Sequence, residues 1–345
     1  MPPIDDVLVL GGGIVGAAVA LHCAERGLAV RVLDRAERGG ASTARSMGYV
    51  DVLGPCPPAY LRARREAVAE TAAWLGEEGR TAAGWQACGS LNPEAGRDAV
   101  PVLLAGGVRA EWWSAARVAE EEPAFHAPGP GAVHLPDDAC LDPVRYLALT
   151  RAAARRAGVR WERREAAGVA RAAGGAWSAA GHVARRVVVA AGVWSGALLP
   201  GLALGPDRGT VLEVAGPAAP LLRRYTPSLR ALPDGRVWIG GSHEPGRGEI
   251  DEASAAAEER AGRLLAAALR ELPALAGAVR RRLWVGIRPM PADGLPLAGP
   301  WRGAPGLFVC VTHSGVTMAQ WLGRRMAGLL CGDPVPELAP FRPDR

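Results

Sequence analysis

The chain has 345 residues, of which 49% are hydrophobic and 22% charged, and its formal net charge is +5. This length allows one large domain or two medium ones, and the composition is that of an ordinary globular protein. All 40 basic residues are arginine and are spread along the chain, with no basic tract interleaved with aromatic residues. The sequence therefore argues against nucleic-acid binding.

The sequence begins directly with a predicted strand and contains no run of about 18 apolar residues that could span a membrane. We therefore expect a cytoplasmic protein. Its six cysteines are scattered and form no C-x-x-C pair. This spacing favours neither a zinc site nor a disulfide framework, so we expect no bound metal.

A glycine cluster near the start of the chain is the strongest local signal. An apolar run over residues 7–10 leads into it, and an apolar segment over 14–21 follows, which predicts strand, tight turn and buried helix. Gly11, Gly13 and Gly16 match the G-x-G-x-x-G spacing of dinucleotide sites. The N–H groups and dipole at the start of such a helix attract a pyrophosphate.

The segment that follows strengthens this interpretation. Residues 28–33 are predicted to form a second buried strand, and Asp34 ends it, at about the distance from the glycines where an acid holds a ribose hydroxyl. Strand, turn, helix, strand and acid in this order predict a nucleotide site. The alternative is a glycine-rich turn in another α/β protein, with Asp34 as a surface acid.

The middle of the chain contains further predicted elements. Residues 35–49 are predicted to form a loop that lies against another part of the protein, with a flexible surface loop as the alternative. A helix is predicted over 58–79. Asp142 and Pro143 form a typical helix start, so a second helix is expected to end near Ala157.

The remaining elements alternate between strands and helices. We expect a hairpin over 176–192, a helix over 251–271, a turn-rich segment over 288–296 and an amphipathic helix over 316–330. Further strands are predicted over 159–161, 208–214, 236–240, 282–287 and 307–311.

This order indicates an α/β fold with two domains, each discontinuous in sequence. A Rossmann-like nucleotide-binding domain would comprise residues 1–84, 137–208 and 283–345. An α+β substrate domain with a mixed sheet would comprise 85–136 and 209–282. We expect the ligand site to lie between them.

Taken together, these segments resemble the flavin-dependent amino acid oxidase family that includes glycine oxidase, sarcosine oxidase and D-amino acid oxidases and dehydrogenases. The resemblance spans almost the whole chain. It rests on the glycine motif with Asp34, on Asp142-Pro143 and on residues 187–195, 286–299, 312–315 and 341–345. It implies that FAD, rather than a nicotinamide, occupies the first motif, and that it is bound non-covalently because Arg288 lies in the region where sarcosine oxidases carry a flavin-linked cysteine.

The resemblance assigns a cofactor contact to each matching segment. The glycine cluster would hold the pyrophosphate, the loop after Asp34 would lie along the isoalloxazine, and the start of the last helix would face the pyrimidine end of the flavin. The residues implied are Gly11, Gly13, Ile14, Val15, Gly16, Asp34, Arg35, Ser42, Thr43, Arg45, Ser46, Met47, Gly48, Ala166, Ala190, Ala191, Gly192, Trp194, His313, Ser314, Gly315, Val316 and Thr317.

For the substrate, the resemblance points to Arg288, whose planar guanidinium can hold a carboxylate through two charge-assisted hydrogen bonds. The alternative is an arginine that caps carbonyls or pairs with Asp293. Ser228 stands where the family often has a carboxylate-binding tyrosine, which leaves the substrate open, and Arg230 is a further candidate.

The expected reaction is oxidation of an amine by hydride transfer to the flavin, giving an imine that water hydrolyses to a 2-oxo acid and ammonia or an amine. The electrons pass to O2 or to another acceptor. Glycine, sarcosine or a D-amino acid is the leading substrate class. The alternatives are the same chemistry on a specialised-metabolite intermediate, and an FAD-binding subunit of a hetero-oligomeric dehydrogenase. A homo-oligomer is left open.

Overall fold

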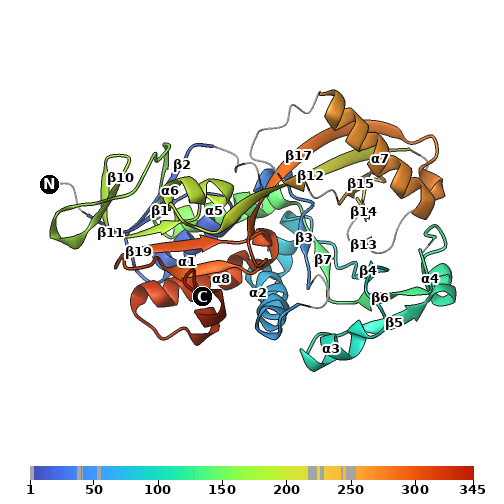
Figure 1. Ribbon diagram of the computed structural model, residues 1–345, viewed down its shortest axis with the longest axis horizontal. Helices are drawn as coiled ribbons and strands as arrows, with labels where there is room; N and C mark the ends of the chain where they lie inside the picture. Colours follow the sequence, from blue (N-terminus) through green and yellow to red (C-terminus); the bar gives the residue numbers. More distant parts are fainter. Residues whose placement is uncertain are drawn as a thin grey trace.

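A computed structural model describes residues 4–36, 40, 42–52, 56–126, 128–216, 229–241 and 254–345, and the backbone of 224–225 and 244–245. The α-helices of these segments are α1 Ile14–Glu25, α2 Pro58–Ala82, α3 Ala99–Ala105, α4 Ala115–Glu121, α5 Pro143–Arg156, α6 Ser195–Leu198, α7 Ala255–Glu271 and α8 Gly315–Cys331. Figure 1 shows that the molecule is elongated, with one sheet in each half.

The first half is built on an eight-stranded sheet with the order β18-β19-β11-β1-β2-β8, to which β10 and β9 are attached beside β11. Strands β19, β11, β1, β2 and β8 run parallel to one another, and β18 runs antiparallel at the edge. The strands are β1 Asp5–Leu10, β2 Val30–Asp34, β8 Arg160–Arg163, β9 Ala170–Arg171, β10 Trp177–Ala179, β11 His182–Val189, β18 Leu297–Pro300 and β19 Leu307–Val311.

Strand β1 is apolar at successive positions because both of its faces are buried. Val7 and Val9 lie in the core beneath α1 and α8, whereas Leu8 and Leu10 lie in a second core on the opposite face. All four are at most 2% exposed. A continuous apolar run is what a central parallel strand requires when layers cover both sides of the sheet.

The helices α1 and α8 pack closely together over one face of this sheet, with α5 beside α1 and α2 beside α8. Gly323 allows the close approach, because a Cβ there would lie 2.8 Å from the Ala18 backbone. The predicted start of α5 is confirmed. The Asp142 carboxylate accepts hydrogen bonds from the backbone N–H groups of Val144 and Arg145 and so caps the helix.

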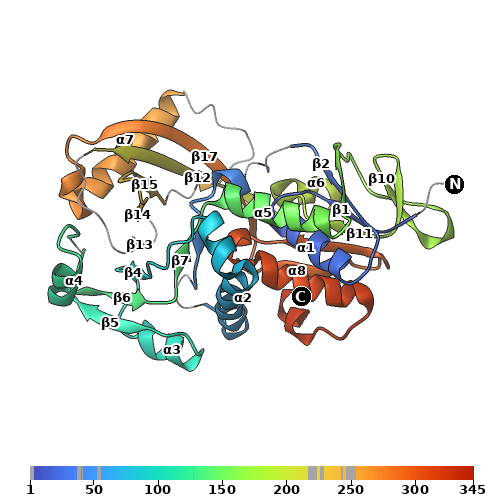
Figure 2. The same cartoon turned by 180° about the vertical axis from the view of Figure 1, so that it is seen from behind.

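The second half is built on a nine-stranded sheet with the order β16-β12-β15-β14-β13-β4-β6-β5, in which β17 pairs with β12. The strands are β4 Ser90–Asn92, β5 Glu111–Ser114, β6 Gly131–Leu135, β12 Leu204–Ala215, β13 Arg224–Tyr225, β14 Leu229–Ala231, β15 Val237–Gly240, β16 Glu244–Pro245 and β17 Val279–Pro291. Helix α7 lies across one face of β12, β15 and β17, as both views show (Figure 1, Figure 2).

The boundary between the two sheets differs from the predicted domain boundary at two segments. Residues 204–208 and 283–291, which were predicted to belong to the nucleotide-binding domain, lie in the nine-stranded sheet, because β12 and β17 pair along their whole length. The prediction that residues 288–296 are turn-rich was wrong for 288–291. Pro289 and Pro291 fit this strand because, among the described residues, β17 pairs only with β12 and so lies at an edge.

A short two-stranded sheet, β3 Tyr49–Val50 with β7 Ala139–Cys140, connects the two halves. Within the described residues, the helices are too short or too polar to cross a membrane. Those residues also contain no group of three or more side chains suited to holding a metal ion.

Candidate active site

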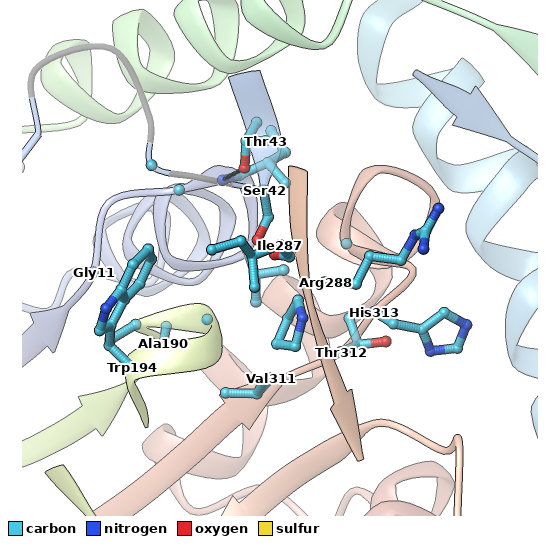
Figure 3. Close-up of a pocket in the computed structure, with 18 of the residues that line it drawn as sticks. Gly11, Ser42, Thr43, Ala190, Trp194, Ile287, Arg288, Val311, Thr312 and His313 are labelled. Atoms are coloured by element: carbon cyan, nitrogen blue, oxygen red, sulfur yellow. Dashed lines mark hydrogen bonds between the residues drawn. The ribbon is translucent and has the colours of Figure 1, made fainter. Parts of the chain in front are cut away.

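A cavity of about 530 Å³ is lined by both sheets. The ends of β1, β2, β11 and β19 and the starts of α1 and α8 form one wall, and β12 and β17 contribute Gly209, Val211 and residues 286–290 to the other. Figure 3 shows Trp194 beside Gly11 in one part of the cavity, and Arg288 and His313 close to each other in another. The cavity therefore extends from the turn at Gly11 to the side chains of Arg288 and His313.

At the first end, Gly11 makes the turn from β1 into α1. Its φ is +103°, and a Cβ would lie 2.5 Å from the Ala190 carbonyl oxygen, so only glycine fits. The Ile14 N–H donates to Thr43 Oγ1 at 3.2 Å. The next N–H groups of the first turn of α1 have no intrahelical acceptor and are placed for an anion.

The carboxylate of Asp34 lies at the carboxyl end of β2, on the cavity wall. It accepts hydrogen bonds from the Gly12 and Ala36 N–H groups, both at 2.8 Å. Arg151 of α5, which the sequence did not single out, donates to it at 3.2 Å. Burial lowers the pKa of Arg151. Asp34 is thus an oriented hydrogen-bond acceptor rather than a free surface acid.

A stacked pair of side chains lies next to Asp34 on the cavity wall. The Arg35 guanidinium stands 3.9 Å from the centroid of the Trp194 ring, and its Nη1 lies 3.3 Å from Glu165 Oε1. Ala166 lies next to Glu165 on the same wall. Such a mixed aromatic, cationic and backbone surface suits a planar heterocycle.

The segment predicted as a loop over 35–49 lies against β17, as expected. Ser42 Oγ donates to the Ile287 carbonyl at 2.5 Å, and Arg45 Nη1 donates to the Val285 carbonyl at 2.9 Å. In return, Trp284 Nε1 donates to the Arg45 carbonyl at 3.1 Å. The described part of this segment is therefore tied to the second sheet, and Ser42, Thr43, Arg45, Ser46 and Met47 line the cavity.

At the other end, Arg288 of β17 lies directly opposite Asp207 of β12, and its Nη1 lies 2.8 Å from Asp207 Oδ2. A Cβ on Gly209 would overlap the Arg288 guanidinium, so this glycine provides the space that the arginine occupies. The alternative partner Asp293 instead pairs with Arg345. Arg288 lines the cavity and is partly exposed to it.

The start of α8 forms the wall near His313. Ser314 precedes the helix, and its N–H donates to Thr312 Oγ1 at 3.2 Å. His313 through Thr317 all line the cavity. The N–H groups in the first turn of this helix, like those of α1, have no intrahelical acceptor and give the N-terminal end a partial positive charge.

Three of the predicted site residues that the structure describes do not line this cavity. Arg230 is 3% exposed and donates to the Met47 and Leu141 carbonyls and to Gln86 Oε1, so it supports the cavity loop from behind. Gly16 and Gly48 pack against the backbones of Gly11 and Leu141. Ser228 lies outside the described residues.

The remaining predicted cofactor residues line the cavity, and so do further residues that the sequence did not reveal. Most of these unpredicted residues contribute only backbone atoms or an apolar side chain, and such contacts have no recognisable motif in the sequence. They are Leu10, Leu33, Ala36, Gly40, Tyr49, Asp51, Arg64, Arg164, Glu165, Ala167, Ala197, Leu198, Gly209, Val211, Gly241, Gly286, Ile287, Pro289, Met290, Cys310, Val311 and Thr312.

These features are typical of a nucleotide-binding site. A family model described as FAD dependent oxidoreductase matches residues 6–329, and the chain therefore belongs to this family. It is an FAD-dependent oxidoreductase.

Two curated relatives match almost the whole chain. The tRNA 5-methylaminomethyl-2-thiouridine biosynthesis bifunctional protein MnmC of Paracidovorax citrulli is 34% identical over 96% of this chain, but the chain spans only 58% of that protein. Glycine oxidase of Bacillus licheniformis is 26% identical over 96% of this chain and 94% of its own. Among solved structures, glycine oxidase from Geobacillus kaustophilus has a TM-score of 0.85 and 24% identity, with 98% of both chains covered, and supports the fold.

The residues present fit FAD. The Gly11 turn packs too closely on the Ala190 backbone for any Cβ, and the starts of two helices open into one cavity. An oriented carboxylate and the stacked side chains of Arg35 and Trp194 lie beside the first helix start. A phosphate-bearing dinucleotide with a planar ring at each end needs these features in this order.

Proposed function

We propose that this protein oxidises the amine of a small amino acid, of the glycine, sarcosine or D-amino acid type, to an imine that water hydrolyses to a 2-oxo acid and ammonia or an amine. The observation that carries this proposal is the placement of Arg288. It projects into the cavity at the end away from the Gly11 turn, with one edge of its guanidinium already held by Asp207.

Arg288 has the chemistry of a carboxylate anchor. Because Asp207 fixes Nη1 at 2.8 Å, the plane of the guanidinium is set before a substrate arrives. A guanidinium can form charge-assisted hydrogen bonds to a carboxylate, which would fix the position of the neighbouring α-carbon. Holding the reacting carbon in one orientation supplies much of the rate enhancement that such a reaction needs.

The cofactor would be held non-covalently. The α1 start would hold its pyrophosphate, Asp34 its ribose and the α8 start its pyrimidine end, as the family resemblance implies. Bound FAD supplies the hydride acceptor for the amine. Cys310 lines the cavity, but burial raises the pKa of its thiol, which keeps it protonated and unreactive.

A second candidate is the same chemistry on a larger amine, such as a specialised-metabolite intermediate. It is favoured by the 34% identity to the bifunctional MnmC protein, whose name refers to an aminomethylated nucleoside. A third is a role as the FAD-binding subunit of a hetero-oligomeric dehydrogenase. Turnover by the isolated chain would argue against the third candidate. The cytoplasmic location, homo-oligomerisation and the identity of the electron acceptor stay predictions.

Turnover and product analysis test the proposal. The purified protein, loaded with FAD, would be supplied separately with glycine, sarcosine, D-alanine and D-proline, with O2 or an artificial dye as acceptor. We expect one of them to yield a 2-oxo acid or glyoxylate and ammonia or an amine. Turnover of none of them, together with turnover of a larger secondary amine, would replace the first candidate by the second.

A further inference from the structure

A buried ion pair stands in the cavity wall beside the start of α8. Arg64 of α2 is 1% exposed and Asp51 is 3% exposed, and both line the cavity. Arg64 Nη2 donates to the Asp51 carboxylate and, at 2.9 Å, to the Asp51 carbonyl. Neither residue belongs to a recognisable motif in the sequence.

The pair is tied to the residues that begin α8. Arg64 Nη1 donates to Ser314 Oγ at 2.5 Å and to the Tyr60 hydroxyl at 3.0 Å. The Asp51 N–H donates to Thr317 Oγ1 at 3.2 Å. The cation thus contacts the residue before the helix, and the anion's backbone contacts its first turn.

Stability alone does not account for this arrangement. Burying two charges costs solvation that their attraction often fails to recover, so a buried pair is weak evidence of a stabilising role. Burial opposes the charge on Arg64, yet Tyr60 and Asp51 outweigh it and raise the pKa of the guanidinium. Arg64 therefore stays charged, and its Nε has no hydrogen-bond partner within the described residues.

The position of the pair gives it an electrostatic consequence. Charges in a buried wall are weakly screened, so each acts on the cavity at this end. Reducing a flavin adds negative charge to its ring, and the positive end of a helix stabilises that charge. An isolated cation beside the α8 start would add to this effect, and an isolated anion would oppose it.

We propose that Asp51 and Arg64 are positioning residues that hold the start of α8 and balance the charge at the redox end of the cavity. The positive charge of Arg64 favours the reduced flavin and the negative charge of Asp51 opposes it. The midpoint potential of the bound flavin therefore depends on both charges being present. This proposal rests on the FAD site described above and on the placement of the flavin ring at the α8 end.

The test is a double-mutant cycle that removes each charge in turn, read out as the midpoint potential of the bound flavin, with FAD affinity measured alongside. We expect Arg64→Met to lower the potential and Asp51→Asn to raise it. Each change should correspond to about tenfold or more in the reduction equilibrium, or about 30 mV for two electrons. The double variant should have a midpoint potential near that of the wild type. Arg64→Lys keeps the positive charge, so its potential should also lie close to the wild-type value.

Glu70→Gln is the matched control. Glu70 and Arg325 form an ion pair between the same two helices, α2 and α8, but neither residue lines the cavity. This variant should leave the potential unchanged while it lowers stability. If Arg64→Met does not fold, Asp51→Asn still tests the loss of one charge, and Arg64→Lys still tests the conservative replacement.

The proposal is overturned if both single variants move the potential in the same direction, if neither moves it, or if Glu70→Gln moves it as much. Failure of the FAD site itself is a separate result, because wild-type protein would then bind no flavin. If the wild-type protein binds FAD but the variants do not change its midpoint potential, this inference is rejected and the proposed function is not.

Discussion

The two ends of the cavity are built in different ways. At the Gly11 end, the turn, the α1 start and Asp34 all come from one contiguous segment, residues 7–36. At the Arg288 end, side chains from distant segments meet, as Asp207 does with Arg288 and Arg64 with Ser314. A local chain segment thus forms the nucleotide end, and long-range pairing forms the substrate end.

The difference teaches that the two ends can be damaged separately. A change at the turn should remove the cofactor and leave the arginine in place, whereas a change beside the arginine should remove turnover and leave the cofactor bound. The following variants test that separation, from the largest expected effect to the smallest.

Arg288→Ala should have the largest effect on turnover. Losing two charge-assisted hydrogen bonds to a carboxylate should lower kcat/KM by about two to four orders of magnitude. The bound FAD should be retained, as judged by its absorption. Arg345→Ala removes an arginine that pairs with Asp293 instead and should leave kinetics unchanged. Unchanged kinetics in Arg288→Ala would remove its role as carboxylate anchor.

Gly11→Ala should act on the opposite end. The new Cβ would overlap the Ala190 carbonyl, and the backbone would be strained, so FAD affinity should fall about 100-fold or more. Equilibrium dialysis or fluorescence titration measures this change. Gly27→Ala also alters a glycine with positive φ but meets no neighbouring atom, so it should leave FAD affinity unaltered. Equal losses in both variants would mean that general backbone strain, not the turn, limits binding.

Gly209→Ala should perturb the arginine without touching the cofactor. Its Cβ would displace the Arg288 guanidinium, and we expect KM to rise by about tenfold, equivalent to about 1.4 kcal/mol. Gly205→Ala is the matched control in the same strand, because its Cβ would lie 3.8 Å from the nearest atom. Steady-state kinetics of the two variants compare these effects, and an unchanged KM in Gly209→Ala would place the substrate away from Arg288.

Ser42→Ala should have the smallest effect. It removes the hydrogen bond to the Ile287 carbonyl, worth about 1 kcal/mol, so FAD affinity should fall about fivefold. Ser178→Ala removes a serine on the exposed hairpin and should change nothing. A loss in Ser42→Ala as large as that in Gly11→Ala would show that the two ends are not separable, because Ser42 joins the loop to β17.

The sequence was sufficient where structure follows from neighbouring residues. The β1–α1–β2 unit could be predicted because its apolar runs and glycines are contiguous, and Asp142 caps α5 through groups two and three residues away. The whole-chain resemblance supplied the second half of the cavity. The helix over 58–79 was also predicted, although the structure extends it to Ala82.

The remainder depends on pairings between segments far apart in the sequence. Asp207 lies opposite Arg288 only because β12 and β17 are in that register, and Arg230 turns away from the cavity because the Met47 and Leu141 carbonyls accept its hydrogen bonds. Arg64 lies on a helix that reads as an ordinary amphipathic one. A single sequence carries no sign that such a residue reaches the cavity wall.

The most direct test of the central claim is an absorption spectrum of the purified protein without O2, before and after adding glycine, sarcosine, D-alanine or D-proline separately. We predict flavin bands that bleach with one of these compounds. That result would place the cofactor and the amine oxidation in this one chain. Protein that shows no flavin bands even after incubation with FAD would contradict the assignment of the cavity that begins at Gly11.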